Sequence, residues 1–316
     1  MCHHPADPGG ARPGHRAGLR QARGDIPRVR RARTASAAPA VRVGDRTRHR
    51  PRGVARRTQG RVRSRGAIVN RISRPHPRPW ASRRLICLSF AGGGTVGFRP
   101  WAQQLPVDIE LRALCYPGRE SRFGDQVPGG WQGLVDDCVT ALRNEVRGPY
   151  VLYGHSMGAL VAFEAARALQ ARGAEGPDGL VLSGHIAPQH WTGTRTAALS
   201  AAPDEELACW LEATGGAPRA VLADPDLRSL AVDLLRLDMT AYSAYRFEPG
   251  ERLRAPIHLM VGEAEWSPLH EGWAELTDGS YSQVVLPGGH FFTPRVWGAL
   301  PLHMPLSTDT TAGLAG

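Results

Sequence analysis

Short apolar runs and helical patterns alternate along most of the chain after residue 80. Residues 85–90 form an apolar run that ends in a glycine-rich loop, which is typical of a buried strand. Between residues 131 and 146 the apolar positions recur at helical spacing, which predicts an amphipathic helix packed against a sheet. The predicted strands are 85–90, 109–116, 150–153, 180–183, 257–261 and 283–286, and the predicted helices are 131–146, 157–172 and 270–276. This alternation predicts an α/β fold over residues 81–300, with a mostly parallel central sheet flanked by helices.

Residues 188–256 break the alternation, because they contain helical patterns at 204–211 and 227–245 but no convincing strand. The insertion follows a strand, so it lies at the carboxyl edge of the sheet, where ligands bind in such folds. We therefore interpret it as a helical lid over the site. An ordinary pair of packing helices is the alternative interpretation.

Both ends of the chain differ from this central domain in composition. Residues 1–80 hold 21 Arg and three acids with no sustained helical or strand period, which predicts a disordered Arg/Pro/Gly-rich extension. This extension is either translated upstream DNA from an early start codon, with the true beginning near Val69, or a solvated tail, or an arm that binds nucleic acid or acidic surfaces. Residues 301–316 contain Pro, Thr and Gly and predict a flexible tail.

Charge and composition exclude several classes of partner. The formal net charge is +10, but residues 1–80 carry +18 of it and the remaining residues carry −8. All 39 basic residues are arginine, as GC-rich coding favours, so we expect no nucleic-acid partner. No window approaches the roughly 18 apolar residues of a membrane span, and no secretion signal is present, so we expect a cytoplasmic protein without a membrane partner. The five cysteines include no CxxC pair, and we expect no metal.

The most specific motif is Gly-His-Ser-Met-Gly at residues 154–158, which lies between a predicted strand and a predicted helix. A serine in this G-x-S-x-G context sits on a tight, strained turn that raises its hydroxyl above the sheet, and the two glycines leave room for the turn. The motif therefore predicts that Ser156 is the nucleophile of an α/β-hydrolase fold.

A serine hydroxyl needs a base to accept its proton, and in this fold the base is a histidine late in the chain. His290 fits, because it follows a predicted strand within the glycine-rich segment 287–292. The competing histidines are His185, His258, His270 and His303.

A carboxylate must orient that imidazole, and it usually follows a later strand of the sheet. The segment after the strand 257–261 offers two glutamates and no aspartate. Glu265 occupies the usual place three residues after Gly262, and Glu263 is the fallback.

Acyl transfer also needs two amide donors for its oxyanion. We expect them at Met157, next to the nucleophile, and at Ala91 in the glycine-rich loop after the first predicted strand. That loop is followed by neither of the common nucleotide-binding glycine patterns, so we discount a phosphate cradle.

From about residue 84 to 292 the chain resembles the stand-alone type II thioesterases that accompany polyketide synthases and nonribosomal peptide synthetases. It departs from the family in having glutamates where aspartate is usual, and in a shortened C-terminal helix. The motifs that carry the resemblance are Ala91-Gly92-Gly93, Tyr116-Pro117-Gly118-Arg119-Glu120, Gly154-His155-Ser156-Met157-Gly158-Ala159 and Gly288-Gly289-His290-Phe291-Phe292.

The resemblance implies an editing enzyme that removes aberrant acyl groups from the phosphopantetheine arm of an acyl or peptidyl carrier protein. It implies a triad with Ser156 and His290, an oxyanion hole at Ala91 and Met157, a helical lid, and no cofactor. We expect a monomer. Because the folded part is acidic, a local arginine patch near Arg119, Arg122 or the lid would have to receive the acidic carrier protein.

Two other functions stay open at this point. One is a general serine esterase acting on small esters, which a thioester-over-ester rate ratio and carrier dependence would distinguish. The other is a catalytically impaired binding protein, suggested by the missing aspartate and the unusual ends of the chain.

Overall fold

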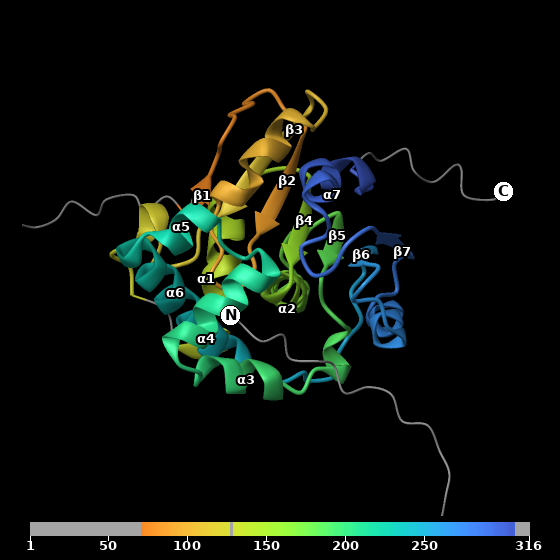
Figure 1. Ribbon diagram of the computed structural model, residues 1–316. Helices are drawn as coiled ribbons and strands as arrows, with labels where there is room; N and C mark the ends of the chain where they lie inside the picture. Colours follow the sequence, from red (N-terminus) through yellow and green to blue (C-terminus); the bar gives the residue numbers. More distant parts are fainter. Residues whose placement is uncertain (1–70, 127–128, 307–316) are drawn as a thin grey trace, which may run out of the picture. The chain divides into compact units, whose positions relative to one another are not determined.

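A seven-stranded sheet forms the centre of this computed structural model, which describes residues 71–126 and 129–306 (Figure 1). The strand order is β1-β3-β2-β4-β5-β6-β7; β1 is antiparallel to its neighbour and all other pairs are parallel. The predicted mostly parallel sheet is confirmed. Its strands are β1 (Ile72–Ser73), β2 (Arg83–Leu88), β3 (Ile109–Leu114), β4 (Tyr150–His155), β5 (Gly179–Ser183), β6 (Ile257–Gly262) and β7 (Tyr281–Leu286).

The order of the strands determines where a site can form. β2 pairs with β3 on one side and with β4 on the other. The chain therefore adds β3 on one side of β2 and the later strands on the opposite side, so the strand order reverses at β2. In open parallel sheets the loops that follow the strands on either side of such a reversal leave a crevice at the carboxyl edge. The loops after β2 and β4 meet there, and the loops after β5, β6 and β7 leave the same edge.

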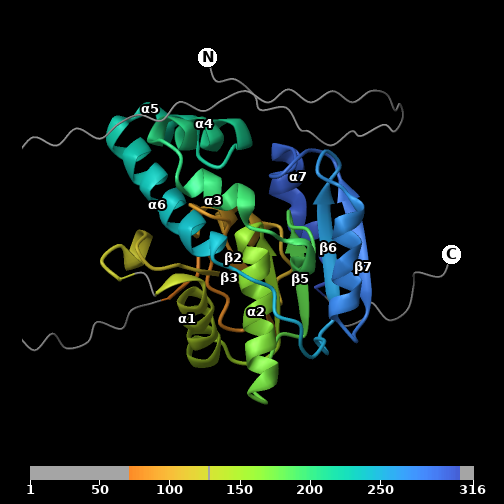
Figure 2. The ribbon, with the colours of Figure 1, turned by 90° about the horizontal axis from the view of Figure 1, so that it is seen from below.

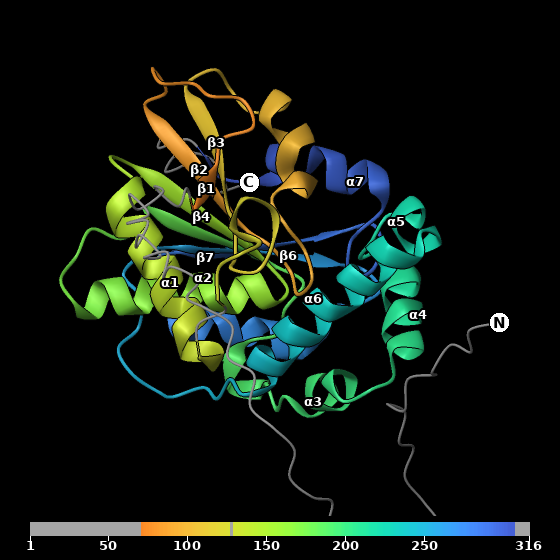
Figure 3. The same ribbon diagram turned by 90° about the vertical axis from the view of Figure 1, so that its left-hand side faces the viewer.

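Helices cover both faces of the sheet, and each face has its own apolar core. Figure 3 shows α1 (Gly130–Glu145) and α2 (Met157–Ala171) on one side of the sheet and α7 (Pro294–Ala299) on the other. α2 is buried almost all round, because its small and apolar residues pack between the sheet and the helices outside it. The 3-10 helix η1 (Val96–Gln103) lies with α7, where Trp101 donates its indole N–H to the carbonyl of Trp297 at 2.8 Å.

The insertion at residues 188–256 is helical, as predicted, and contains no strand. Figure 2 shows its four α-helices grouped together. The longest, α6, begins with Asp224 as a side-chain cap and Pro225 in the first turn, a favourable start for a helix. The insertion contains η3 (Pro188–His190), α3 (Thr194–Ser200), α4 (Asp204–Thr214), α5 (Arg219–Ala223) and α6 (Pro225–Ser243); the remaining elements of the fold are η2 (Glu120–Arg122), η4 (Pro268–Leu276) and η5 (Leu300–His303).

The predicted end of the N-terminal extension at residue 80 is wrong, because residues 71–80 belong to the fold. Ile72 is buried and pairs with Leu114, adding an antiparallel strand to the sheet edge. Arg74 pairs with the buried carboxylate of Glu110, which also accepts the backbone N–H of Arg78 at 3.0 Å. Periodicity missed this segment because a two-residue strand has none. Residues 1–70 of the predicted extension lie outside the described residues.

The predicted flexible tail also begins too early. Residues 301–306 pack against the domain, with Met304 and Leu306 buried in the second core. Arg83 of β2 donates to the carbonyl of Leu306 at 2.9 Å, so this end is tied to the sheet. The rest of the predicted tail, 307–316, lies outside the described residues. None of the helices in the described ranges is long and apolar enough to cross a bilayer.

Replacing Glu110 by Gln should cost about 3 kcal/mol of unfolding free energy, because it removes the buried carboxylate that binds Arg74 and Arg112. Asp178→Asn is the matched control, since Asp178 pairs with Arg83 at a half-exposed site and should lose less than about 1 kcal/mol. Urea unfolding of both variants measures the difference. Equal small losses would show that residues 71–80 are not held by Glu110.

Candidate active site

Ser156 lies on the turn between β4 and α2 with φ 56° and ψ −122°. A residue with a side chain is strained in this left-handed region, and such strain persists only where the surroundings enforce it. Here the N–H of Ser156 donates to the carbonyl of Ser183 at the end of β5, at 2.8 Å. The turn is thus held by the neighbouring strand, and the hydroxyl is presented above the carboxyl edge of the sheet.

The two glycines of the motif are required by close approach. A Cβ on Gly154 would lie 2.1 Å from the carbonyl oxygen of Gly158, and a Cβ on Gly158 would lie 2.5 Å from that of Leu88. Neither contact is possible for a larger residue. Because Gly154 and Gly158 have no side chains, the N-terminus of α2 can approach the end of β2, where the glycine-rich loop begins.

The structure brings Ser156, His290 and Glu265 into one hydrogen-bonded line. Nε2 of His290 lies 3.0 Å from Oγ of Ser156, and Nδ1 lies 2.8 Å from Oε1 of Glu265. Glu263, the fallback for the acid, is exposed and makes no such contact within the described residues. The loop after β6 turns between the two glutamates, since the N–H of Glu265 donates to the carbonyl of Gly262 at 2.9 Å.

The charge on Glu265 determines how the histidine is protonated. Burial opposes ionisation of Glu265, but its hydrogen bond to His290 and the nearby histidine rings outweigh burial and lower its pKa. An ionised carboxylate only accepts hydrogen bonds, so Nδ1 of His290 must donate to it. Nε2 is then free to accept the proton of the Ser156 hydroxyl. The arrangement can therefore deprotonate a serine for attack on a carbonyl carbon.

The loops that carry the acid and the histidine are joined to each other through the backbone. The N–H of Glu263 donates to the carbonyl of Leu286 at 2.9 Å, and that of Ala264 donates to Gly288 at 3.0 Å. These bonds extend the pairing of β6 and β7 beyond the strands themselves. The separation between Glu265 and His290 is consequently set by the sheet.

His155, inside the motif, is buried beside His290, a placement that the sequence did not reveal. Its ring is fully buried and lies 5.1 Å from the ring of His290, centroid to centroid. Nδ1 lies 2.8 Å from Oγ of Ser183, which also contacts the hydroxyl of Tyr153. Burial, and then the nearby imidazoles of His290 and His185, hold the pKa of His155 well below its ordinary value, so the ring is neutral.

None of the competing histidines contacts Ser156 within the described residues. His258 lies in β6 beside Ser282, His270 caps η4, and His303 is exposed on η5. His185 is buried, and its Nε2 lies in contact with the hydroxyl of Tyr242 on α6.

The two amides predicted to hold an oxyanion lie at the reversal point of the sheet. Ala91 follows β2, and Met157 begins α2. Neither N–H donates a hydrogen bond within the ranges that the structure describes. Two acids whose roles the sequence did not identify hold the loop that carries Ala91. Glu120 accepts the N–H of Thr95 at 2.7 Å, and Asp238 of α6 accepts that of Gly92 at 2.6 Å.

A signal for Asp238 was present in the sequence. It stands among apolar residues that repeat at helical spacing, so it falls on the buried face of α6 with Leu235, Met239 and Tyr242. An acid on an apolar helical face needs a buried partner.

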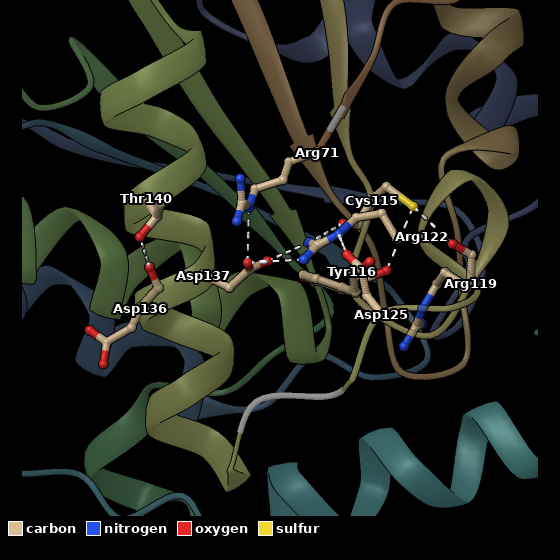
Figure 4. Close-up of polar contacts among 9 residues, drawn as sticks. All are labelled: Arg71, Cys115, Tyr116, Arg119, Arg122, Asp125, Asp136, Asp137 and Thr140. Atoms are coloured by element: carbon tan, nitrogen blue, oxygen red, sulfur yellow. Dashed lines mark hydrogen bonds and ion pairs between the residues drawn. The ribbon is translucent and has the colours of Figure 1, made fainter. Parts of the chain in front are cut away.

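Of the places expected for a docking patch, Arg119 and Arg122 are wrong, because both side chains are buried, 3% and 4% exposed. A patch on the lid stays a prediction. Figure 4 shows Arg122 and Arg71 converging on Asp137 of α1, while Arg119 points away from this cluster. Arg119 instead pairs with Asp238 at 2.6 Å. These arginines join loops to helices and leave no charge for a partner.

Comparison with known proteins matches residues 83–295 to the thioesterase domain family. The gramicidin S biosynthesis protein GrsT of Aneurinibacillus migulanus is 33% identical over 67% of this chain and 83% of its own length. Thioesterase PikA5 of Streptomyces venezuelae is 31% identical over 72% of this chain and 81% of its own length.

Solved structures agree with the sequence relatives. The type II thioesterase BorB from the borrelidin biosynthetic cluster superposes with a TM-score of 0.64 at 32% identity, covering 73% of this chain and 96% of its own. The RedJ thioesterase of the prodiginine pathway in Streptomyces coelicolor gives a TM-score of 0.64 at 30% identity, covering 71% and 86%.

If Glu265 orients His290, Glu265→Gln should slow covalent labelling of Ser156 by a fluorophosphonate about 10³-fold or more, because Nδ1 loses its carboxylate. Glu263→Gln is the matched control and should label at a rate close to the parent rate. Mass spectrometry of the labelled protein over time gives both rates. A larger effect from the Glu263 variant would reverse the assignment.

The buried histidines should make the fold acid-sensitive. Burial lowers the pKa of His185 to about 4, below its ordinary 6.5, so the unfolded chain binds more protons between these values. The stability due to neutral His185 is fully present above about pH 6.5, is lost progressively as pH falls from there, and is gone below about pH 4. The loss near pH 4.5 should reach about 2.5 kcal/mol. Urea unfolding near pH 7.5 and 4.5 should show a smaller loss for His185→Gln; an equal loss would contradict this.

Proposed function

Because the chain belongs to the thioesterase family, we propose that it hydrolyses acyl thioesters held on the phosphopantetheine arm of a carrier protein, with Ser156 as the nucleophile. Membership of the family makes the protein a thioester hydrolase of the serine type. The substrate class follows from its relatives, which include a gramicidin S biosynthesis protein and type II thioesterases of polyketide and nonribosomal peptide pathways. We assign it the same editing role, the removal of aberrant acyl groups.

The single observation that carries the catalytic part of this proposal is the line from Ser156 through His290 to Glu265, with distances of 3.0 and 2.8 Å. Such a line provides a nucleophile, a base that can take its proton, and a carboxylate that stabilises the charged imidazole. The acid is a glutamate, and its side chain reaches Nδ1 from the loop after β6.

The proposed reaction begins when Nε2 of His290 takes the hydroxyl proton and Oγ of Ser156 attacks the thioester carbonyl carbon. The carbonyl oxygen becomes an oxyanion held by the N–H groups of Ala91 and Met157. The carbon–sulfur bond then breaks, and His290 returns the proton to the leaving thiolate. Water, which gives a proton to the same histidine, then attacks the acyl carbon. The bond from that carbon to Oγ of Ser156 breaks, His290 returns the proton to Oγ, and a carboxylic acid leaves. Each step uses side chains and amides of this chain alone, and no cofactor takes part.

The helices α3–α6 are the lid of the proposed site. α6 reaches the glycine-rich loop, where Asp238 binds Gly92. Tyr242 of α6 stacks on Trp191 at 4.6 Å and contacts His185 beyond β5. The insertion therefore borders the site on the side of the loops after β2 and β5, and an acyl chain would lie between it and the triad.

The test is steady-state hydrolysis of acyl-loaded carrier protein by the parent, by Ser156→Ala, and by Ser82→Ala, an exposed serine in a loop, as the control. Ser156→Ala should reduce kcat by at least about 10⁴-fold, because it removes the nucleophile. The control should match the parent.

The substrate class is tested in the same assay. The parent should prefer the thioester to the oxygen ester of the same acyl group, and acyl carrier protein to acyl pantetheine alone. A preference for small oxygen esters without carrier dependence would make the protein a general esterase. An inert parent with native fold would leave a binding role.

A further inference from the structure

A buried ion pair joins the lid to the glycine-rich loop. Asp238 lies on the buried face of α6, with its side chain 5% exposed. Nη2 of Arg119 donates to Oδ1 at 2.6 Å, and Nη1 donates to Oδ2 at 2.8 Å. Oδ2 also accepts the backbone N–H of Gly92 at 2.6 Å. One carboxylate therefore binds both a guanidinium and a loop amide.

Arg119 holds the same loop at a second point. Its Nη1 donates to the carbonyl of Gly93 at 2.7 Å, so the N–H of Gly92 and the C=O of Gly93 are both bound. Burial alone would lower the pKa of Arg119, but Asp238 more than reverses this and raises it, so the guanidinium stays charged. The pair carries no net charge next to the proposed oxyanion.

Packing leaves the loop little freedom to move against α6. Gly92 has φ +78°, and a Cβ at this position would lie 3.3 Å from both Cα and Cβ of Leu235. The loop backbone thus rests directly on the helix, one turn before Asp238. A larger residue at 92 would force the two apart.

Fixing the N–H of Gly92 has a consequence for Ala91. That N–H belongs to the peptide plane between the two residues, and a planar peptide moves as a unit. The N–H of Ala91 belongs to the preceding peptide plane, which is joined to the held plane at the Cα of Ala91. Holding one plane therefore restricts the φ and ψ rotations of Ala91 and limits the direction of its N–H, the proposed oxyanion donor. An amide misplaced by about 1 Å can cost about 100-fold in rate.

We propose that Asp238 is a positioning residue of the oxyanion hole, through which the lid helix α6 sets the direction of the Ala91 amide. Arg119 neutralises Asp238, so that its carboxylate does not repel the developing oxyanion. This inference rests on the proposed function. The inference also requires that α6 and the glycine-rich loop remain in contact. Their separation would expose the Arg119–Asp238 pair to water or leave a buried charge without its partner.

The test compares Asp238→Asn with Asp137→Asn in the full chain. Asp137 also pairs with a buried arginine of the loop after β3, Arg122, but it lies on α1 and does not contact the glycine-rich loop. Both variants should lose similar stability in urea. Asp238→Asn alone should lower kcat about 10- to 100-fold with KM within about threefold, because the effect falls on the transition state.

A second readout separates positioning from a general structural role. A trifluoromethyl ketone analogue of the acyl group binds Ser156 as a tetrahedral adduct that uses the oxyanion hole. Its inhibition constant should rise for Asp238→Asn by about the same factor as kcat falls, and should not change for Asp137→Asn. Equal kinetic effects in the two variants would overturn the proposal. An inactive parent would instead overturn the proposed function.

If Asp238→Asn does not fold, Arg119→Lys and Arg119→Gln decide the question. Lysine keeps a cation beside Asp238, whereas glutamine leaves its carboxylate unneutralised on the Gly92 amide. Arg119→Lys should retain at least about fivefold more kcat than Arg119→Gln, since a like charge near the oxyanion is unfavourable. Equal kcat values would overturn the proposal.

Discussion

The left-handed turn at Ser156 is the constraint on which the rest of the site depends. Such a conformation costs about 1–3 kcal/mol at a residue with a side chain, so the fold must supply that energy elsewhere. It does so through the amide of Ser156, bound to the carbonyl of Ser183, and through the close approach of Gly154 and Gly158. The same approach brings the first amide of α2 to the end of β2. One backbone feature therefore places Ser156 and the glycine-rich loop close together.

Buried arginine–carboxylate pairs hold the loops in place. Arg74 binds Glu110, Arg122 binds Asp137, and Arg119 binds Asp238, and in each pair at least one side chain is almost fully buried. A planar guanidinium can satisfy a carboxylate and nearby carbonyls at once, which a lysine ammonium does less well. In a chain whose basic residues are all arginine, this chemistry joins loops to a strand and to helices. The same pairing explains why Arg119 and Arg122, which were expected at the surface, are buried.

The hydrogen-bonded line of Ser156, His290 and Glu265 shows how the sheet sets distances that a loop alone would not. Ser156, Glu265 and His290 follow β4, β6 and β7, and the last two loops are joined by backbone hydrogen bonds beyond the strand ends. A glutamate, one methylene longer than the aspartate usual in the family, reaches Nδ1 of His290 at 2.8 Å. Its lowered pKa keeps it ionised, so that Nδ1 of His290 donates a hydrogen bond to it.

The sequence by itself determined the elements and the motif residues, because local periodicity and the spacing of Gly154, Ser156 and Gly158 express interactions between near neighbours. The strand order, the contact of His290 with Glu265 and not Glu263, and the contact of Asp238 with Gly92 all depend on residues far apart in the chain. The same holds for residues 71–80, whose short strand exists only because β3 offers a free edge and Glu110 a buried charge. Tertiary structure decided these, because a hydrogen bond or an ion pair between distant residues leaves no period in the sequence.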